Sequence, residues 1–478
     1  MTLNRRNLIK LGAAAGTAAC GVLPSGTRAA ASPSPSSAPA PFSVPLSVPP
    51  LLRPVRRTPT ADHYEVTVQE ATAEILPGVD TPVLTYGGSF PGPTIRALRG
   101  RETAIRYTNA LSLPIATHLH GGHVPADQDG YPMDTIEPGA SREYRYVNSQ
   151  PAATLWYHDH AHMSEAESVY RGLAGAYLVH DPLESLLGLP HGPQDVTLML
   201  RDVRLDTEGR LGFSLIDEVA DRNVVLVNGR PQPYFRVSGR RYRLRLMNCS
   251  NGRHFALRLS TGDPLVQIAS DGGLLAAPVP AGTVLLSPGE RAEVVVDFAA
   301  FAPGTAVVLE NVDEEADAAT RSVMRFDVGA RTADFSRVPS KLSVLPPLRT
   351  PTVNRKVVMD FDLESGGVTM DGRTFDPDRI DQRIRFGDTE TWHIENRDTA
   401  TPFRHNMHLH GVHFRVLERN GKPVHGHETG WKDTVAVPKG GDVRLQVTFD
   451  NHTGRYLYHC HLLEHSAMGM MAQMEINR

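Results

Sequence analysis

Cysteine is scarce in this chain, with three among 478 residues: Cys20, Cys249 and Cys460. Exported proteins commonly use cysteines in disulfides, but three cysteines so far apart cannot build a disulfide framework. Cys20 belongs to the N-terminal segment, and Cys249 is expected to be a buried apolar thiol. Cys460 is therefore left for a use other than a disulfide.

The sequence also lacks a strong excess of charge and any sustained helical periodicity. A net charge of -4, from 49 Lys and Arg against 53 Asp and Glu, argues against a nucleic-acid partner. Few helices are expected. The 41 glycines and 37 prolines are typical of a β-rich fold with many turns, and short alternating runs such as 63–68 and 443–449 are expected strands.

A chain of this length is too long for a single core and predicts two to four domains, of which three fits best. Similar turns recur at Pro138-Gly139, Pro288-Gly289 and Lys439-Gly440, as expected of three β-sandwiches of like design. Proline collects near 182–193 and 339–351, where we place the boundaries. The predicted domains are residues 55–182, 190–342 and 346–478.

The N-terminus has features of a twin-arginine export signal. Arg5 and Arg6 precede a weakly apolar stretch and small residues, so residues 1–31 are predicted to be removed on export. Two alternatives are a disordered basic start and lipidation at Cys20, although Thr17 stands where a lipidation motif usually has an aliphatic residue.

We therefore predict an exported protein, extracellular or in the periplasm or cell envelope, with no stable membrane insertion after the signal is removed. Residues 32–54 are rich in Ser, Pro and Ala, with too little apolar surface to fold, and are predicted to be a linker.

Histidine is distributed unevenly along the chain. Of 21 histidines, ten fall in four tight clusters, whereas surface histidines would scatter. A single His-x-His pair is weak evidence for a metal site, because core histidines satisfied by hydrogen bonds are common. Four such pairs, one of which encloses a cysteine, make accidental clustering a poor explanation. The clustered histidines are His118, His120, His158, His160, His405, His408, His410, His459, His461 and His465.

The spacing of these pairs has a physical meaning. Side chains alternate across an extended strand, so a His-x-His pair places both imidazoles on one face. Four such pairs supply eight imidazoles, enough to hold three metal ions with positions open for a small ligand. In His459-Cys460-His461 the same alternation sends the thiol to the opposite face, where it would ligate a different metal.

Candidate partners for Cys460 are His405 and His465, with Met470 as a weak fourth ligand. Two histidines, one cysteine and a long axial methionine make a blue-copper electron-transfer site. Zinc is the main rival, but structural zinc sites are usually four-coordinate and rich in cysteine. The ligand types favour copper. Met470 could instead be core packing, as expected of the neighbouring methionines.

Together these segments resemble the four signature segments of the multicopper oxidase family, closest to bacterial laccases of the spore-coat and bilirubin-oxidase kind. The resemblance covers roughly residues 60–478. It implies three cupredoxin-like Greek-key β-sandwiches. The segments that carry it are His118 to Gly121, Trp156 to His160, His405 to Gly411 and His459 to Met470, with further likeness at Asn228-Gly229, Ser270 to Gly273 and Gly430 to Thr434.

By this resemblance the cofactor is four copper ions, one type 1, one type 2 and two type 3. The type 2 copper would be held by His118 and His408. The type 3 coppers would be held by His120, His158 and His461, and by His160, His410 and His459. The type 1 copper would be held by His405, Cys460 and His465, with Met470 axial.

The implied activity is that of a laccase-type oxidoreductase. A small reductant would dock near His465 and give single electrons, which pass through Cys460 toward the four-electron reduction of O2 to water. A phenol, a bilirubin-like pigment and a metal ion all remain open as reductant. Both halves of the site lie in one chain, so a monomer is expected.

Protons for this reaction need a carboxylic acid near the buried site. Asp129 occupies the place of such an acid in the family and is expected to act catalytically in proton handling, although an aspartate before Gly130 could also be only a turn residue. Many bacterial relatives follow the last type 1 histidine with Glu, whereas this chain has Ser466, with Glu464 nearby. Asn406 replaces a usual proline and is expected to alter the rim of the substrate site.

Two rival functions follow from the same resemblance. A cuprous oxidase would carry methionine-rich inserts, with Asp and Met just before the first type 1 histidine, where this chain has Thr401 and Phe403. A copper-free structural protein on the same fold would have lost ligands, whereas all the ligand positions here are filled.

Overall fold

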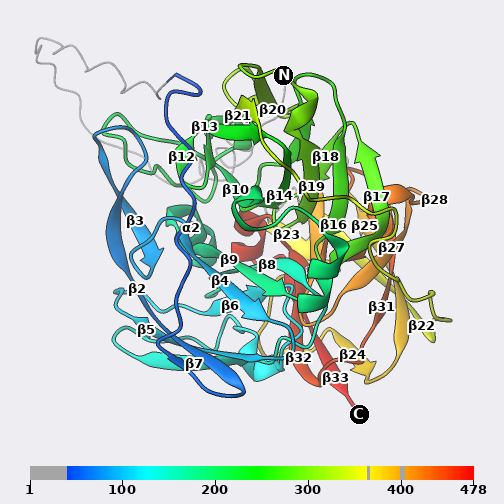
Figure 1. Ribbon diagram of the computed structural model, residues 1–478. Coiled ribbons are helices and arrows are strands. Elements are labelled where there is room, and N and C mark those ends of the chain that lie inside the picture. The colour runs from blue at the N-terminus through cyan, green and yellow to red at the C-terminus, as the bar shows by residue number, and fades with distance from the viewer. Residues whose placement is uncertain (1–39, 363–366, 399–403) are drawn as a thin grey trace, which may run out of the picture.

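The computed structural model describes residues 40–362, 367–398 and 404–478, and the regular secondary structure of this part of the chain is almost entirely strands (Figure 1). Its α-helices are α2 (Glu165–Arg171) and α3 (Leu463–Ala467), none long and apolar enough to cross a membrane. Short 3-10 helices lie at Ala126–Gln128, Pro182–Leu187, Gly192–Gln194, Val219–Asp221, Phe298–Ala300 and Gly426–Thr429. The predicted export signal at residues 1–31 lies outside the described residues.

Two sheets formed by the first part of the chain face each other. One contains β1 (Arg56–Arg57), β2 (Ala61–Glu74), β5 (Glu102–Asn109) and β7 (Ser141–Tyr146), with β3 (Asp80–Tyr86) paired to β2. The other has the order β4 (Gly92–Leu98), β9 (Ala174–His180), β8 (Ala153–Asp159) and β6 (Thr117–His120). Apolar side chains from both sheets form one buried cluster between them.

The middle of the chain forms a second pair of sheets. The larger has the order β12 (Arg230–Pro231), β11 (Val224–Val227), β10 (Asp195–Val203), β14 (Arg241–Asn248), β19 (Arg291–Asp297), β16 (Leu265–Ser270) and β17 (Gly273–Ala281). The smaller has the order β13 (Tyr234–Gly239), β21 (Ser322–Arg331), β20 (Ala306–Asn311), β15 (Phe255–Leu259) and β18 (Val284–Leu286). A second apolar cluster fills the space between them.

The last part of the chain forms a third pair. One sheet has the order β23 (Gly367–Met370), β22 (Val353–Asp362), β25 (Thr389–Asn396), β31 (Asp442–Thr448), β27 (Phe414–Arg419) and β28 (Lys422–Pro423), with β29 (Trp431–Lys432) paired to β27. The other has the order β24 (Gln382–Arg385), β33 (Met471–Asn477), β32 (Gly454–Cys460), β26 (His405–Leu409) and β30 (Thr434–Val437). A third cluster lies between them.

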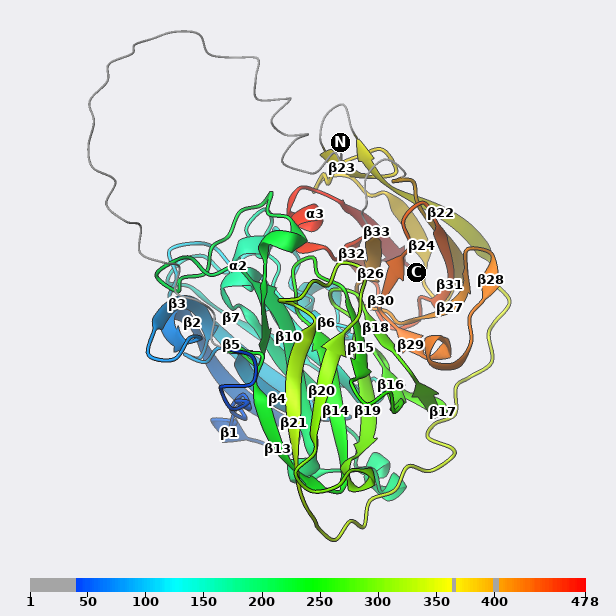
Figure 2. The same cartoon turned by 90° about the horizontal axis from the view of Figure 1, so that it is seen from above.

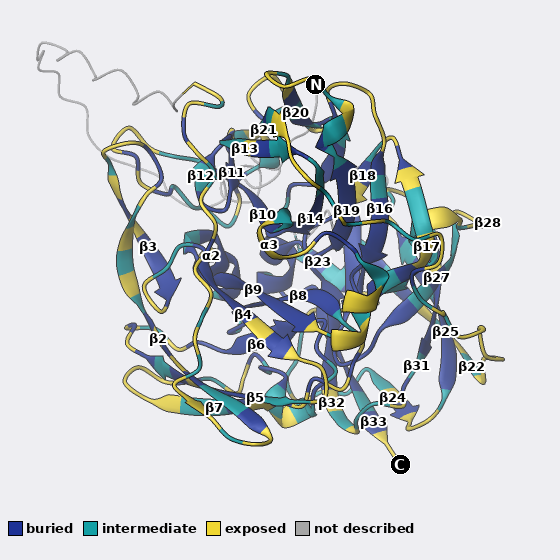
Figure 3. Ribbon diagram, viewed as in Figure 1, coloured by how far each residue is buried: buried dark blue, intermediate teal, exposed yellow. Residues whose placement is uncertain are grey.

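The prediction of an all-β fold built from three sandwiches is confirmed. Sheet neighbours are often far apart in sequence, as in Greek-key connections. Burial follows the layers, with the inner strands buried and the outer edges exposed (Figure 3).

Strand β14 shows how the middle sandwich is packed on both faces. Leu244 and Leu246 face the apolar core between the two middle sheets, so the intervening Arg243 and Arg245 point to the opposite face. That face is also buried, because it packs against the first sandwich, where Arg245 donates to Thr154 of β8 at 2.8 Å. Polar side chains therefore line the contact between the two sandwiches.

Residues 40–54 differ from the unfolded linker that their composition predicts. The Leu46 N–H donates to the Tyr234 carbonyl of the middle sandwich at 2.8 Å, and the Leu52 N–H donates to the Thr94 carbonyl of the first at 2.9 Å. We call residues 40–54 the strap, because they cross from one sandwich to the next. Backbone pairing compensates for the small apolar surface of this segment.

The strap should add measurable stability. A chain that begins at Leu51 loses the buried Val44 side chain and several backbone hydrogen bonds, together about 2 kcal/mol. We expect it to unfold about 2 °C below a chain that begins at Ala40, because a chain of this size has a large entropy of unfolding. Calorimetry of the two metal-free proteins measures the difference, and equal melting temperatures would show that the strap adds no stability.

Candidate metal centres

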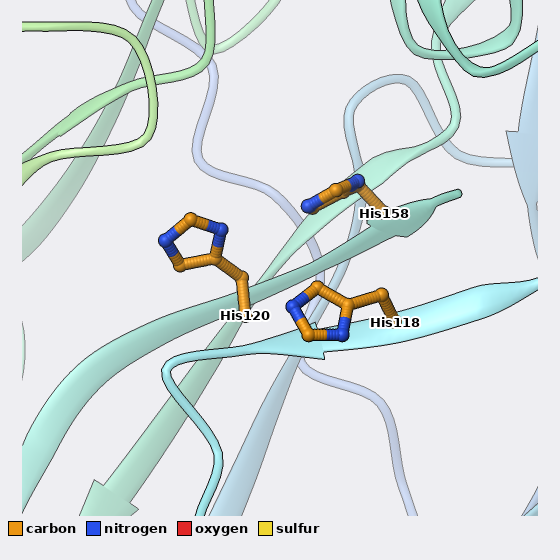
Figure 4. A group of neighbouring side chains, drawn as sticks. All are labelled: His118, His120 and His158. Carbon is orange, nitrogen blue, oxygen red and sulfur yellow. The ribbon is translucent and has the colours of Figure 1, made fainter. Parts of the chain in front are cut away.

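Eight of the clustered imidazoles meet in one buried space between the first and third sandwiches. The strands that bring them there are paired as β6 with β8 and β26 with β32. Figure 1 labels β6, β8 and β32 in the same part of the molecule, and Figure 2 labels β6, β26 and β32 there. Figure 4 shows three of these rings grouped around a common space. Each of the eight is at most 1% exposed: His118, His120, His158, His160, His408, His410, His459 and His461.

Strand register places these rings against one another. His118 lies directly opposite His158 across β6 and β8, and His408 lies opposite His459 across β26 and β32. Residues in such cross-strand positions have closely spaced Cβ atoms. The other members follow by alternation, and three of them, His160, His410 and His461, stand just after their strands end.

One nitrogen of each of several rings is fixed by a backbone carbonyl. His118 Nδ1 lies 2.6 Å from the Asp129 carbonyl oxygen, and His408 Nδ1 lies 2.8 Å from that of Asp433. His158 Nδ1 is held in the same way by the carbonyl of the next residue, at 2.9 Å. Each ring therefore turns its Nε2 toward the shared space.

Carboxylates hold three further rings. His410 Nδ1 lies 2.7 Å from Asp129 Oδ2, and His160 Nδ1 lies 2.6 Å from Glu165 Oε2. His120 is reversed, because its Nε2 faces Asp433 Oδ1 at 3.0 Å and its Nδ1 points inward. A carboxylate in this position fixes the ring orientation and makes the inner nitrogen a better metal ligand.

The inner nitrogens fit a group of metal ions. Several of them are buried and have no hydrogen-bond partner among the described residues: His118 Nε2, His120 Nδ1, His158 Nε2, His408 Nε2 and both nitrogens of His461. A buried nitrogen without a partner costs free energy that a bound metal would remove. Ligand atoms lie within 4.8 Å of one another in three overlapping groups, His118 with His120 and His158, His118 with His408 and His410, and His160 with His410 and His459.

His461 completes the cluster from the third sandwich. Its ring centre lies 4.7 Å from that of His120 and 5.4 Å from that of His158. The eight sequence-predicted imidazoles are therefore all brought together, from segments that lie as much as three hundred residues apart or more.

Burial keeps most of these rings neutral. It lowers the pKa of His118 well below its usual range, and it lowers the pKa of His408 to about 4 despite the nearby Asp433. His160 is an exception, since the Glu165 carboxylate outweighs burial and raises its pKa. Neutral imidazole is the form that binds a metal.

A second candidate centre lies around Cys460. Its Sγ is 3.6 Å from His405 Nδ1 and 3.8 Å from His465 Nδ1, and these two nitrogens are 3.1 Å apart. All three residues are fully buried. Asp398 Oδ2 lies 2.9 Å from His405 Nε2 and so orients that ring toward the sulfur.

Met470 is buried beside this second centre. Its N–H donates to the His465 carbonyl at 2.9 Å, and its own carbonyl accepts from the Cys460 N–H at 3.1 Å. The backbone of Met470 is thus hydrogen-bonded to two of the three residues of the centre, which keeps this residue next to it.

Asn406 is buried rather than at a rim, which corrects the expectation from its sequence position. Its Oδ1 accepts from the His461 N–H at 2.7 Å and lies 3.6 Å from Cys460 Sγ. Its Nδ2 donates to Ser287 Oγ at 2.8 Å and to the Pro288 carbonyl at 2.7 Å. Asn406 and His408 are two residues apart on β26, so strand alternation places both side chains on the same face. This amide therefore points inward, toward the middle sandwich.

Neither Ser466 nor Glu464 supplies a free acid beside the imidazole cluster. Ser466 Oγ lies 3.5 Å from His459 Nδ1. Glu464 is buried but turns toward the middle sandwich, where Arg222 donates to its Oε1 and Asn251 Nδ2 donates to the same oxygen at 3.1 Å. Glu464 is therefore held in an ion pair with Arg222 of the middle sandwich.

Three carboxylates at the sites were missed from the sequence: Glu165, Asp398 and Asp433. Glu165 and Asp398 carry no local motif, because each is brought to its histidine by a turn or short helix. Asp433 lies within the segment Gly430 to Thr434, so the resemblance marked its position but not its role.

Comparisons with known proteins agree on one family. Two family profiles described as multicopper oxidase match residues 67–184 and 345–478. A laccase of Bacillus subtilis is 34% identical over 90% of this chain and 97% of its own length, and a bilirubin oxidase of Albifimbria verrucaria is 34% identical over 90% and 80%. A laccase structure from Pediococcus acidilactici superposes with a TM-score of 0.85 at 34% identity, covering 92% of this chain and 95% of that one.

The buried imidazoles predict how the copper-free protein responds to acid. Burial lowers the pKa of His408 to about 4, below the value of 6.5 in an unfolded chain, so the unfolded state binds the extra proton as the pH falls. For His408 alone this costs about 2 kcal/mol at pH 5. Burial also lowers the pKa of six other histidines, so each of them likewise destabilises the folded state as the pH falls: His118, His120, His158, His410, His459 and His461.

We therefore expect the free energy of unfolding to fall between pH 7 and pH 5, because more histidines have a lowered pKa than there are groups with a raised pKa that opposes the loss. The opposing groups are His160, His405, Asp129, Asp159, Glu290, Glu315 and Asp371. Urea titrations of the copper-free protein measure the loss. His408→Gln is the matched control, because its amide does not titrate, and it should reduce the loss by about 2 kcal/mol. An identical loss in both proteins would contradict the assignment.

Proposed function

Because this chain belongs to the multicopper oxidase family, we propose the following roles for its residues in a laccase-type reaction, the oxidation of a small reductant coupled to reduction of O2. The observation that carries the proposal is the arrangement of eight buried imidazoles with inward-facing nitrogens beside a separate Cys460 centre. The imidazole cluster suits the reduction of O2, and the Cys460 centre suits the entry of electrons from the reductant.

The chain is an oxidoreductase with copper cofactors, and we assign four ions. The overlapping ligand groups support one type 2 and two type 3 coppers in the imidazole cluster and one type 1 copper at Cys460. The proposed ligands are His118 and His408 for type 2; His120, His158 and His461, and His160, His410 and His459, for type 3; and His405, Cys460, His465 and Met470 for type 1.

When bound, the copper ions supply the one-electron chemistry. Cys460 joins the two centres, because His459 and His461 are its covalent neighbours and belong to the imidazole cluster. The Cys460 carbonyl also accepts from His459 Nδ1 at 2.9 Å, which fixes that ring relative to the thiol. The reductant is proposed to dock beside His465.

Asp129 is proposed to handle protons for the imidazole cluster. Its Oδ2 contacts His410 at 2.7 Å, while its Oδ1 is buried and without a hydrogen-bond partner among the described residues. Oδ1 lies 3.5 Å from His118 Nδ1, so the carboxyl group stands between ligands of both sandwiches. Ser466 and Glu464 offer no comparable free carboxyl group.

The two rival functions are not favoured. A copper-free structural protein does not need twelve proposed ligand residues gathered at two buried centres. The residues that bear on a cuprous oxidase, Thr401 and Phe403, lie outside the described residues, and their identities do not match that rival. The relatives named laccase and bilirubin oxidase favour an organic reductant, phenolic or pigment-like.

We propose domains at residues 55–182, 190–342 and 346–478, each holding one pair of sheets. A monomer is proposed, since every ligand comes from one chain. The sequence motif at Arg5 and Arg6 supports export by the twin-arginine route to the periplasm, cell envelope or medium, with a lipid anchor at Cys20 as the alternative.

The function is tested by O2 uptake of the copper-loaded protein with a phenol, bilirubin or Cu(I) as reductant. We expect a blue protein with four coppers that consumes O2 with the phenol or the pigment.

Cys460→Ser should abolish the blue absorption and turnover while three coppers stay bound, because only the thiolate centre is lost. Loss of all four coppers would show that the two centres are not separable.

Asp129→Asn should slow the reaction with O2. A positioned proton donor commonly contributes about 100-fold to 10,000-fold, and the amide keeps the size of the side chain. Stopped-flow measurements time the two half-reactions separately. Reoxidation by O2 should slow while reduction of the blue copper stays fast, and the opposite pattern would show that the assigned role is wrong.

A further inference from the structure

Arg291, in the middle sandwich, reaches the imidazole cluster although this sandwich supplies none of the proposed ligands. It begins β19, directly after the turn at Pro288-Gly289, and its side chain is 1% exposed. The turn itself touches the cluster, since a Cβ on Gly289 would lie 3.1 Å from ring atoms of His120 and His461.

The guanidinium of Arg291 donates two parallel hydrogen bonds to the Asp433 carboxylate. Nη1 donates to Oδ1 and Nη2 donates to Oδ2, both at 2.6 Å. Burial alone would raise the pKa of Asp433, but Arg291 outweighs it and holds that pKa below its usual range. Because both oxygens accept from Arg291, Asp433 is better explained as an orienting group than as a metal ligand.

The other donors of Arg291 are also used, and they tie it to the rest of the molecule. Nε donates to the Thr154 carbonyl of β8 at 2.9 Å, and Nη1 also donates to the Gly289 carbonyl at 3.0 Å. Nη2 also donates to the Asp271 carbonyl at 3.1 Å. One side chain therefore contacts the first, middle and third sandwiches, with five N–H donors for five acceptors.

Asp433, held in this way by Arg291, contacts two histidines from different sandwiches. Its Oδ1 lies 3.0 Å from His120 Nε2, and its carbonyl oxygen lies 2.8 Å from His408 Nδ1. The space is tight, because a Cβ on Gly121 would lie 2.5 Å from Asp433 Oδ2 and 2.7 Å from Arg291 Nη2.

We propose that Arg291 is a positioning residue for the imidazole cluster. By donating to both carboxylate oxygens of Asp433, it sets the orientation of His120 and His408, and this orientation determines how tightly the cluster holds its coppers. This inference rests on the proposed copper assignment. It gives the middle sandwich a direct part in the O2-reducing centre. Lysine could not replace this arginine, since an ammonium lacks the planar fork that matches a carboxylate.

The test compares Arg291→Lys with Arg245→Lys. Arg245 is a matched control on the adjacent strand, because it is also buried, grips Asp195 with two hydrogen bonds and contacts Thr154, but does not reach the cluster. Copper content is measured during dialysis against a chelator, together with the type 2 signal in electron paramagnetic resonance and the blue absorption of the Cys460 centre.

We expect Arg291→Lys to hold the cluster coppers about 10-fold to 100-fold more weakly, with the blue absorption retained and Arg245→Lys close to wild type. Equal retention in the two variants would overturn the proposal, and so would parallel loss from both copper centres, which would indicate general loosening. A wild-type protein without copper in the cluster would instead overturn the proposed function.

A double-mutant cycle adds an independent measurement should Arg291→Lys fold poorly. If Arg291 acts through Asp433, Arg291→Gln together with Asp433→Asn should weaken copper retention no more than Asp433→Asn alone. Fully additive losses would overturn the proposed route through Asp433.

Discussion

The metal centres depend on one recurring interaction, the hydrogen bond between the outer nitrogen of an imidazole and a fixed protein oxygen. It selects the tautomer, stops the ring from turning and leaves the inner nitrogen as a lone-pair donor. Without it, neighbouring rings could turn and hydrogen-bond with one another, because they lie close enough to do so; the His410 and His459 Nε2 atoms are 3.0 Å apart. The site is therefore defined as much by oxygens as by imidazoles.

These oxygens are shared across the contact between the first and third sandwiches. Asp129 of the first holds its own His118 through a carbonyl and His410 of the third through a carboxylate. Asp433 of the third holds its own His408 through a carbonyl and His120 of the first through a carboxylate. Because each aspartate spans the contact in this reciprocal way, docking of the two sandwiches and ordering of the imidazoles are one event.

The sequence predicted the parts of the site that depend on local periodicity. His-x-His pairs on strands must place their rings on one face, and Cys460 between two such rings must point to the other, as its 3.6 Å contact with His405 shows. The groups that hold the ligands have no such period. Asp433 is 313 residues from His120, and Glu165 reaches His160 only because α2 begins there. Asn406 and the strap were misjudged for the same reason, since their hydrogen-bond partners belong to other sandwiches.

A buried cluster of neutral imidazoles also links metal binding to folding. In the copper-free chain the inward nitrogens are desolvated without partners, so their burial lowers stability. A bound metal removes this cost only if the rings are already oriented, because freely turning ligands would lose conformational entropy on binding. The carbonyls, carboxylates and Arg291 order the rings in advance, and the apolar cores of three sandwiches stabilise that order. The free-energy cost of burying these nitrogens is thus offset by parts of the fold that contain no ligand.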